Sequence, residues 1–133
     1  MARVPIVKLG NTLIVTVQEA LHDRDAVRLQ DDITSAIERT GAKGLLIDVS
    51  VLDVVDSFMA RMLAMIGSMA SLMGAKTVVA GIQPAVAVTL TELGITMTGM
   101  ETVLNVERGL LILQRMEASE SGEMPPGGVH DAR

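Results

Sequence analysis

Short runs of β-branched and aliphatic residues alternate with longer segments of helical periodicity along this chain, and that alternation limits the possible folds most strongly. Strand-like runs occupy 4–9, 12–17, 44–49 and 76–82, with a weaker run near 102–105. Helical patterns occupy 23–40, 57–73, 84–93 and 106–116. The first two runs are separated by Gly10 and Asn11, a pair typical of a tight antiparallel hairpin. The order predicts an α/β fold with a mixed, mostly parallel sheet that starts with a β-hairpin and is covered by about four helices.

The length and the tail composition indicate one domain. The chain has 133 residues and a mass of 14.1 kDa, which suits a single core. We expect the domain to cover 1–117 and the Pro-, Gly- and Ser-rich segment 118–133 to be a disordered C-terminal tail. The longest uncharged stretch, 62–75, is too short to span a bilayer, and the N-terminus has no signal-peptide pattern. We therefore expect a cytoplasmic protein with no membrane contact.

Composition excludes several classes of site. The chain has no cysteine and only two histidines, so we expect no metal centre and no thiolate chemistry. A net charge of −5 and a single aromatic residue, Phe58, argue against nucleic acid as a partner. No glycine-rich phosphate loop is present, so no cofactor is expected. A hydrolase that uses Ser57 as its nucleophile would lack a histidine base with a suitable spacing, because His22 precedes the first helix. The predicted class is a non-enzymatic, protein-binding domain.

The helix at 57–73 carries almost no charge. Arg61 is its only charged residue, whereas the helix at 23–40 is rich in charge. The predicted core stripe consists of Phe58, Met62, Met65, Ile66, Met69 and Met73. The predicted opposite face consists of Ser57, Arg61, Ala64, Ser68 and Ser71, with Ala60 and Gly67 nearby. Two interpretations stay open, since such a helix is either buried on all sides or presents its small, neutral face to a partner protein. In the second case we expect the partner to contact Asp56, Ser57, Ala60, Arg61, Ala64 and Ser68.

The start of this helix offers a site for phosphorylation. Either Asp56 or Ser57 is expected to cap the unpaired N–H groups of the first turn. A phosphate on Ser57 would be tolerated there by the helix dipole, yet it would place about −1.5 to −2 charge on a neutral contact surface. Thr89 is a secondary candidate acceptor, whereas Thr77 begins a strand and is expected to be buried.

Two stretches resemble a known family. The segment 44–58, GLLIDVSVLDVVDSF, resembles the strand, loop and phosphoserine helix start of STAS domains, the anti-sigma-factor antagonist fold. The segment 72–95, LMGAKTVVAGIQPAVAVTLTELGI, is similar to the small stressosome scaffold proteins of the RsbS type. The resemblance covers about 4–116.

This resemblance implies a non-enzymatic scaffold and antagonist in bacterial stress-response signalling. Such proteins assemble with STAS-containing co-antagonists, which carry a sensory N-terminal domain, into a large closed shell. The shell sequesters a serine/threonine switch kinase and releases it on phosphorylation, and a PP2C-type phosphatase resets it. The resemblance places the phosphoacceptor at Ser57, preceded by Asp56.

One departure bears on the choice within the family. Ordinary antagonists continue after the phosphoserine with a small hydroxyl residue and a glycine, whereas Phe58 and Met59 follow here. This difference favours the stressosome branch. The alternative is a free anti-sigma-factor antagonist in a partner-switching module.

Overall fold

The computed structural model describes residues 4–92, 94 and 100–120. The strands and helices in this part follow the predicted order. They are β1 (Ile6–Leu9), β2 (Thr12–Thr16), α1 (Asp23–Thr40), β3 (Gly44–Asp48), α2 (Ser57–Leu72), β4 (Lys76–Ala80), α3 (Pro84–Glu92), β5 (Met100–Val103) and α4 (Val106–Glu120). Proline begins α3, as predicted, because its fixed φ suits the first helical position.

The strands form one mixed sheet in the order β1-β2-β3-β4-β5. β1 and β2 pair antiparallel through the turn at Gly10, whose φ of 60° favours glycine, and the remaining neighbours pair parallel. Val15, Ile47 and Val79 lie side by side across the three central strands. The predicted sheet, with its opening hairpin, is confirmed.

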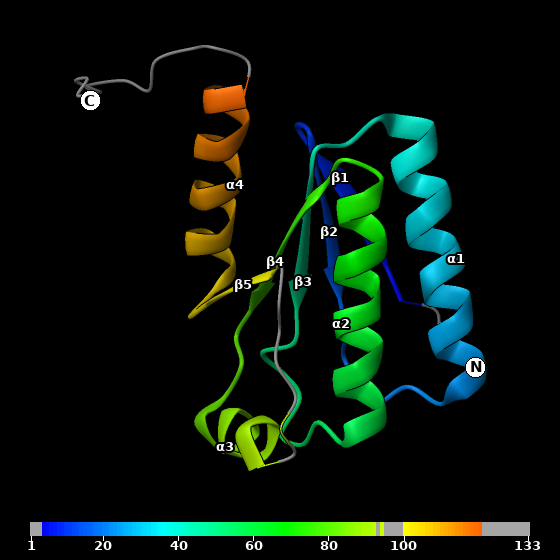
Figure 1. Ribbon diagram of the computed structural model, residues 1–133, viewed down its shortest axis with the longest axis vertical. Coiled ribbons are helices and arrows are strands. Elements are labelled where there is room, and N and C mark those ends of the chain that lie inside the picture. The colour runs from blue at the N-terminus through cyan, green and yellow to red at the C-terminus, as the bar shows by residue number, and fades with distance from the viewer. Residues whose placement is uncertain (1–3, 93, 95–99, 121–133) are drawn as a thin grey trace.

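Helices cover both faces of this sheet. α1 and α2 lie side by side on one face, α4 lies on the other, and α3 lies at the end of the sheet where α1 and α2 begin (Figure 1). β3 and β4 are apolar on both faces because parallel strands between helix layers have no solvent side. The first turn of α2 is therefore at the same end of the molecule as α3 and the carboxyl ends of the parallel strands.

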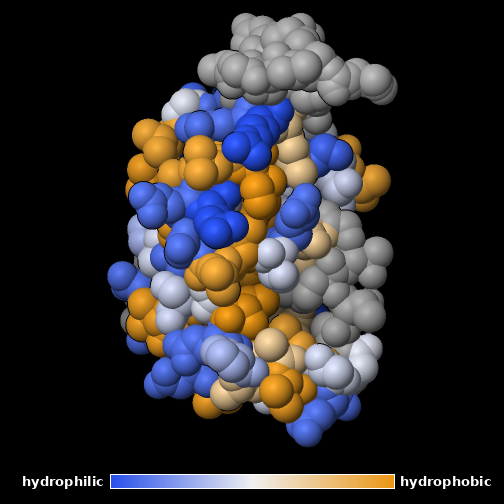
Figure 2. Space-filling view, turned by 90° about the vertical axis from the view of Figure 1, so that its left-hand side faces the viewer, coloured by the Kyte–Doolittle hydropathy of each residue, from blue (hydrophilic) through white to orange (hydrophobic). Residues whose placement is uncertain are grey.

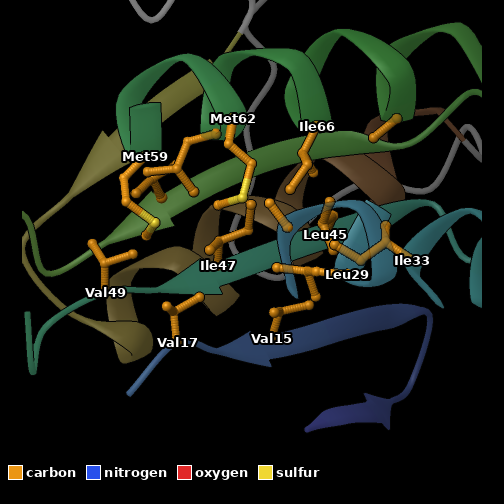
Figure 3. Close-up of a cluster of buried hydrophobic side chains, with 14 of the residues drawn as sticks. Val15, Val17, Leu29, Ile33, Leu45, Ile47, Val49, Met59, Met62 and Ile66 are labelled. Atoms are coloured by element: carbon orange, nitrogen blue, oxygen red, sulfur yellow. The ribbon is translucent and has the colours of Figure 1, made fainter. Parts of the chain in front are cut away.

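The larger core lies between the sheet and the α1–α2 layer. Side chains of α2 point towards the sheet and meet those of β2, β3 and α1 (Figure 3). The labelled members of this cluster are Val15, Val17, Leu29, Ile33, Leu45, Ile47, Val49, Met59, Met62 and Ile66. A smaller cluster around Leu46, Val78, Ala80 and Leu113 anchors α4 on the opposite face. The sheet and α1 thereby pack against the buried side of α2.

Several boundaries differ from the sequence prediction by a few residues, and two of the differences lie in the last part of the described chain. α4 continues to Glu120, so residues 118–120 belong to a helix and not to the predicted tail; 121–133 lie outside the described residues. The last strand begins at Met100, two residues earlier than predicted, because it pairs with β4 from Thr77 onward. Leu93, the last residue of the helical pattern predicted at 84–93, also lies outside the described residues. In the described part of the chain, every helix is too short or too polar to cross a membrane.

Candidate functional site

Asp56 is the residue that caps α2. Its backbone is extended (φ −82°, ψ 177°), and its carboxylate accepts a hydrogen bond of 2.8 Å from the N–H of Met59. This is the N-cap geometry in which a side-chain oxygen satisfies a first-turn donor. Ser57 is consequently the first helical residue, which decides between the two capping assignments.

Ser57 occupies a position suited to an added anion. It is half-buried at the start of a helix whose first turn holds no acidic side chain. The first N–H groups of a helix have no intrahelical partner, and the helix dipole is positive at this end. A phosphate on Ser57 would therefore meet N–H groups and positive potential within its own chain.

The buried side of α2 differs from the predicted one by a rotation about the helix axis. Met62 and Ile66 are buried as predicted, but Phe58 is 36% exposed and Met65 is 57% exposed. The buried residues are Met59, Ala60, Met62, Leu63, Ile66, Gly67 and Ala70. The predicted core membership of Phe58 and Met65 is therefore wrong.

Ala60 also differs from its predicted role. It was expected to contact a partner, but its side chain is 0% exposed and packs into the core below α2. Arg61 and Ser68 are exposed and Ala64 is half-buried, so these three share the accessible side of the helix with Ser57. Any partner of this surface therefore contacts it without Ala60.

The exposed side of α2 is nearly uncharged. We call it the outer face of α2, and it consists of Phe58, Arg61, Met65, Ser68, Ser71 and Leu72. Leu72 is 90% exposed, and Arg61 is the only charged residue. Apolar groups that stay in contact with solvent mark interaction surfaces when they gather on one face. The interpretation in which α2 is buried on every side is thus excluded.

An apolar groove separates this outer face from α1. Its volume is about 440 Å³, and its walls are formed by Ala26, Val27, Phe58, Met62 and Met65, with the polar residues Asp23, Gln30 and Arg61. Phe58, the residue that follows Ser57, is part of the groove wall. An apolar side chain of a partner could therefore enter the groove close to Ser57.

The structure brings one segment to this site that sequence reasoning did not place there. The N–H of Leu21 lies 3.5 Å from Sδ of Met59, so the residues before α1 lie beside the first turn of α2. His22 follows Leu21 and is exposed. Among the hydrogen bonds of the described residues, none joins Ser57 to a histidine. Nothing in the spacing of 21 and 59 along the chain signals this contact.

The threonine candidates lie elsewhere. Thr89 is half-buried on α3, and its hydroxyl donates to the carbonyl of Ala85 at 3.0 Å. Thr77 is buried in β4, as expected, and its hydroxyl has no hydrogen-bond partner. Neither residue belongs to the outer face of α2.

Residues 3–108 match the STAS domain family. The chain belongs to that family. The predicted STAS fold, with its hairpin-initiated mixed sheet and four helices in the described part, is confirmed.

Three similar proteins indicate which members of the STAS family this domain resembles in sequence and structure. A serine-to-glutamate variant of RsbS from Moorella thermoacetica is 40% identical with a TM-score of 0.77, and the match covers 87% of this chain and 98% of that one. A structure described as the molecular architecture of the stressosome, a signal integration and transduction hub, contains a chain that is 42% identical. Its TM-score is 0.76, and the match covers 85% of this chain and 98% of that one. The predicted resemblance to the RsbS type is confirmed.

The third relative is a larger protein. The RsbT co-antagonist protein RsbRA of Bacillus subtilis (strain 168) is 25% identical over 100 residues. The match covers 75% of this chain but only 36% of RsbRA. The STAS domain described here therefore corresponds to about a third of that co-antagonist.

Removing the cap should destabilise α2 in a way that distinguishes hydrogen bonding from charge. We expect Asp56→Ala to lower the free energy of unfolding by about 1 kcal/mol, because the N–H of Met59 loses its acceptor. Asp56→Asn keeps an acceptor oxygen and should lose much less. Urea denaturation monitored by circular dichroism measures both variants. Equal losses would show that the carboxylate charge, and not its hydrogen bond, holds the helix start.

The orientation of α2 can be tested with two methionines. Met59→Ala should cost about 3 kcal/mol, because it leaves a cavity in the core. Met65→Ala should cost less than about 1 kcal/mol, because its side chain is largely in solvent. The same denaturation assay compares them, and a larger loss for Met65→Ala would contradict the orientation of the helix.

Proposed function

We propose that this STAS domain is a non-enzymatic stressosome scaffold and antagonist in bacterial stress signalling. It sequesters a serine/threonine switch kinase on the outer face of α2 and releases the kinase when Ser57 is phosphorylated. It assembles with copies of itself and with STAS-containing co-antagonists that carry a sensory N-terminal domain. A PP2C-type phosphatase removes the phosphate, and the whole cycle takes place in the cytoplasm.

One observation carries this proposal: Ser57 is the first residue of a helix whose exposed side combines apolar and small hydroxyl residues with a single charge, that of Arg61. The nearest acidic side chain, Asp56, is engaged in capping. A phosphate added at Ser57 would be the dominant charge at that end of the surface. Hence a single modification changes the character of the binding surface without disturbing the core.

The energy needed for release is modest. A tenfold change in affinity corresponds to about 1.4 kcal/mol. Burying an uncompensated charge at an interface costs more than this when the partner offers no matching cation. The helix dipole stabilises the phosphate within the chain, so the cost falls on the complex and not on the fold.

The relatives support assembly into a shell more than action as a free antagonist. The two structures with 40% and 42% identity are an RsbS protein and a stressosome, and each is matched along almost its whole length. The resemblance to one third of RsbRA supports a co-antagonist with a related STAS domain as the partner within the shell. A free anti-sigma-factor antagonist remains the alternative, and it would form only a small complex with its target.

The assignment of the phosphoacceptor can be tested with the cognate kinase and ATP. We expect mass spectrometry to find one phosphate, on Ser57, and we expect none on the Ser57→Ala variant. Ser68→Ala is the matched control, because Ser68 is an exposed serine of the same helix, and it should be phosphorylated like the wild type. Thr89→Ala tests the secondary site. Undiminished phosphorylation of Ser57→Ala would contradict the assignment.

Assembly is tested separately by size-exclusion chromatography with light scattering. Together with its co-antagonist, the chain should elute as a particle many times larger than either protein alone. A complex of only two or three chains would favour the free-antagonist alternative.

A further inference from the structure

The methionines of α2 differ sharply in their access to solvent. The helix contains Met59, Met62, Met65 and Met69. Met59 and Met62 are 1% and 3% exposed and Met69 is half-buried, whereas more than half of Met65 is exposed. Among the methionines that the structure describes, Met65 is the only one with an exposed side chain.

The sulfur of Met65 lies at the rim of the groove between α1 and α2. Its Sδ accepts a hydrogen bond of 3.3 Å from Nε2 of Gln30 on α1. Val27 and Phe58 line the same groove, and both are themselves exposed. A small oxidant can therefore approach this thioether from solvent, and the amide of Gln30 is already placed to donate to an oxygen added there.

We propose that Met65 is a site of reversible oxidation by hydroperoxides. The sulfur lone pair attacks one oxygen of hydrogen peroxide, an S–O bond forms and the O–O bond breaks. The departing hydroxide takes up the remaining proton and leaves as water. The sulfur is oxidised by two electrons to the sulfoxide, and the peroxide is reduced. Methionine sulfoxide reductases reverse the change.

Oxidation of Met65 alters the surface to which the kinase would bind. The expected effect on kinase binding rests on the proposed function. The sulfoxide is polar, so it replaces an adaptable apolar side chain beside Phe58 with a group that resists burial. Met65 lies one helical turn from Arg61, on the outer face of α2. A bound kinase would shield Met65, whereas the free chain would be oxidised and would then recapture the kinase less well. Oxidation and binding thus oppose each other.

The site is tested by peptide mapping of the intact chain after brief exposure to dilute hydrogen peroxide. Trypsin cleaves after Lys43, Arg61 and Lys76, so Met59 falls in one peptide and Met65 in the next, where fragment ions distinguish it from Met62. We expect Met65 to be oxidised at least about tenfold faster than Met59 and Met62, and methionine sulfoxide reductase to restore it. Oxidation of Met65 no faster than that of Met59 and Met62 would overturn the proposal.

The consequence is tested by measuring the affinity of the kinase for the chain before and after oxidation. We expect about a tenfold loss in the wild type and none in Met65→Leu, which keeps an apolar side chain without a sulfur. Circular dichroism should show that the oxidised chain remains folded. Equal affinity before and after oxidation, or the same loss in Met65→Leu, contradicts this inference. Absence of kinase binding to the untreated chain would instead contradict the proposed function.

Discussion

The Ser57→Glu variant is expected to bind the cognate kinase about thirtyfold more weakly than the wild type. The glutamate places a negative charge at the first position of α2, where the outer face carries no charge other than Arg61. Adding a carboxylate to an interface whose partner offers no matching cation costs about 2 kcal/mol, which corresponds to this loss of affinity. Isothermal titration of purified kinase into each variant measures the effect.

The matched control for charge is Ser57→Gln, which has the same size and no charge. It should lose much less affinity than Ser57→Glu. Folding stability should not fall in Ser57→Glu, because an acidic side chain in the first turn of a helix interacts favourably with the dipole. If the glutamine variant lost as much affinity as the glutamate variant, bulk at position 57 and not charge would control binding.

The second large effect concerns Gly81, which joins β4 to α3. Its φ is 85°, and a Cβ added there would lie 2.5 Å from Cβ and 2.7 Å from Cα of Ser50 in the loop that leads to α2. Gly81→Ala therefore combines an unfavourable backbone conformation with a collision against another backbone segment. We expect it to lower the free energy of unfolding by about 3 kcal/mol, as measured by urea denaturation.

The Gly74→Ala variant separates the cost of the backbone conformation from the cost of the collision. The φ of Gly74 is 86°, but a Cβ added there meets nothing within 4 Å. Gly74→Ala should therefore cost only the conformational part, about 1 kcal/mol. Similar losses for the two variants would mean that close packing between the loops after β3 and β4 contributes little to stability.

The sheet and the order of its strands and helices could be predicted because both depend on patterns within short segments of the sequence. Strand and helix periodicities differ, and glycine or proline marks the boundaries, as at Gly10, Gly41 and Pro84. The start of α2 was predictable for the same reason, since Asp56 followed by an apolar run is a helix-start signal. Its capping hydrogen bond confirms that signal.

The buried side of α2 could not be read from the sequence. Apolar residues occupy most positions from Phe58 to Leu72, so more than one stripe satisfies the helical period. Packing against α1 and the sheet selects the stripe that contains Met59 and Leu63, and it leaves Met65 outside. The contact between Leu21 and Met59 depends on the same tertiary arrangement.

The two faces of the sheet also differ in a way that local patterns do not reveal. Within the residues that the structure describes, α4 is the one helix over its face of the sheet, and apolar side chains remain visible between polar ones (Figure 2). Val7 and Leu9 of the edge strand β1 and Leu111 of α4 are each more than half exposed. Alternation along a strand indicates which residues share a face, but it does not indicate how much of that face a helix covers.

The central claim is that negative charge at the first residue of α2 releases a protein bound to the outer face of that helix. The most direct measurement is the affinity of the kinase for the chain phosphorylated on Ser57, compared with the same sample after treatment with a PP2C-type phosphatase. We predict at least a thirtyfold weaker affinity for the phosphorylated chain and full recovery after dephosphorylation. Equal affinity of the two forms for the kinase would contradict the account.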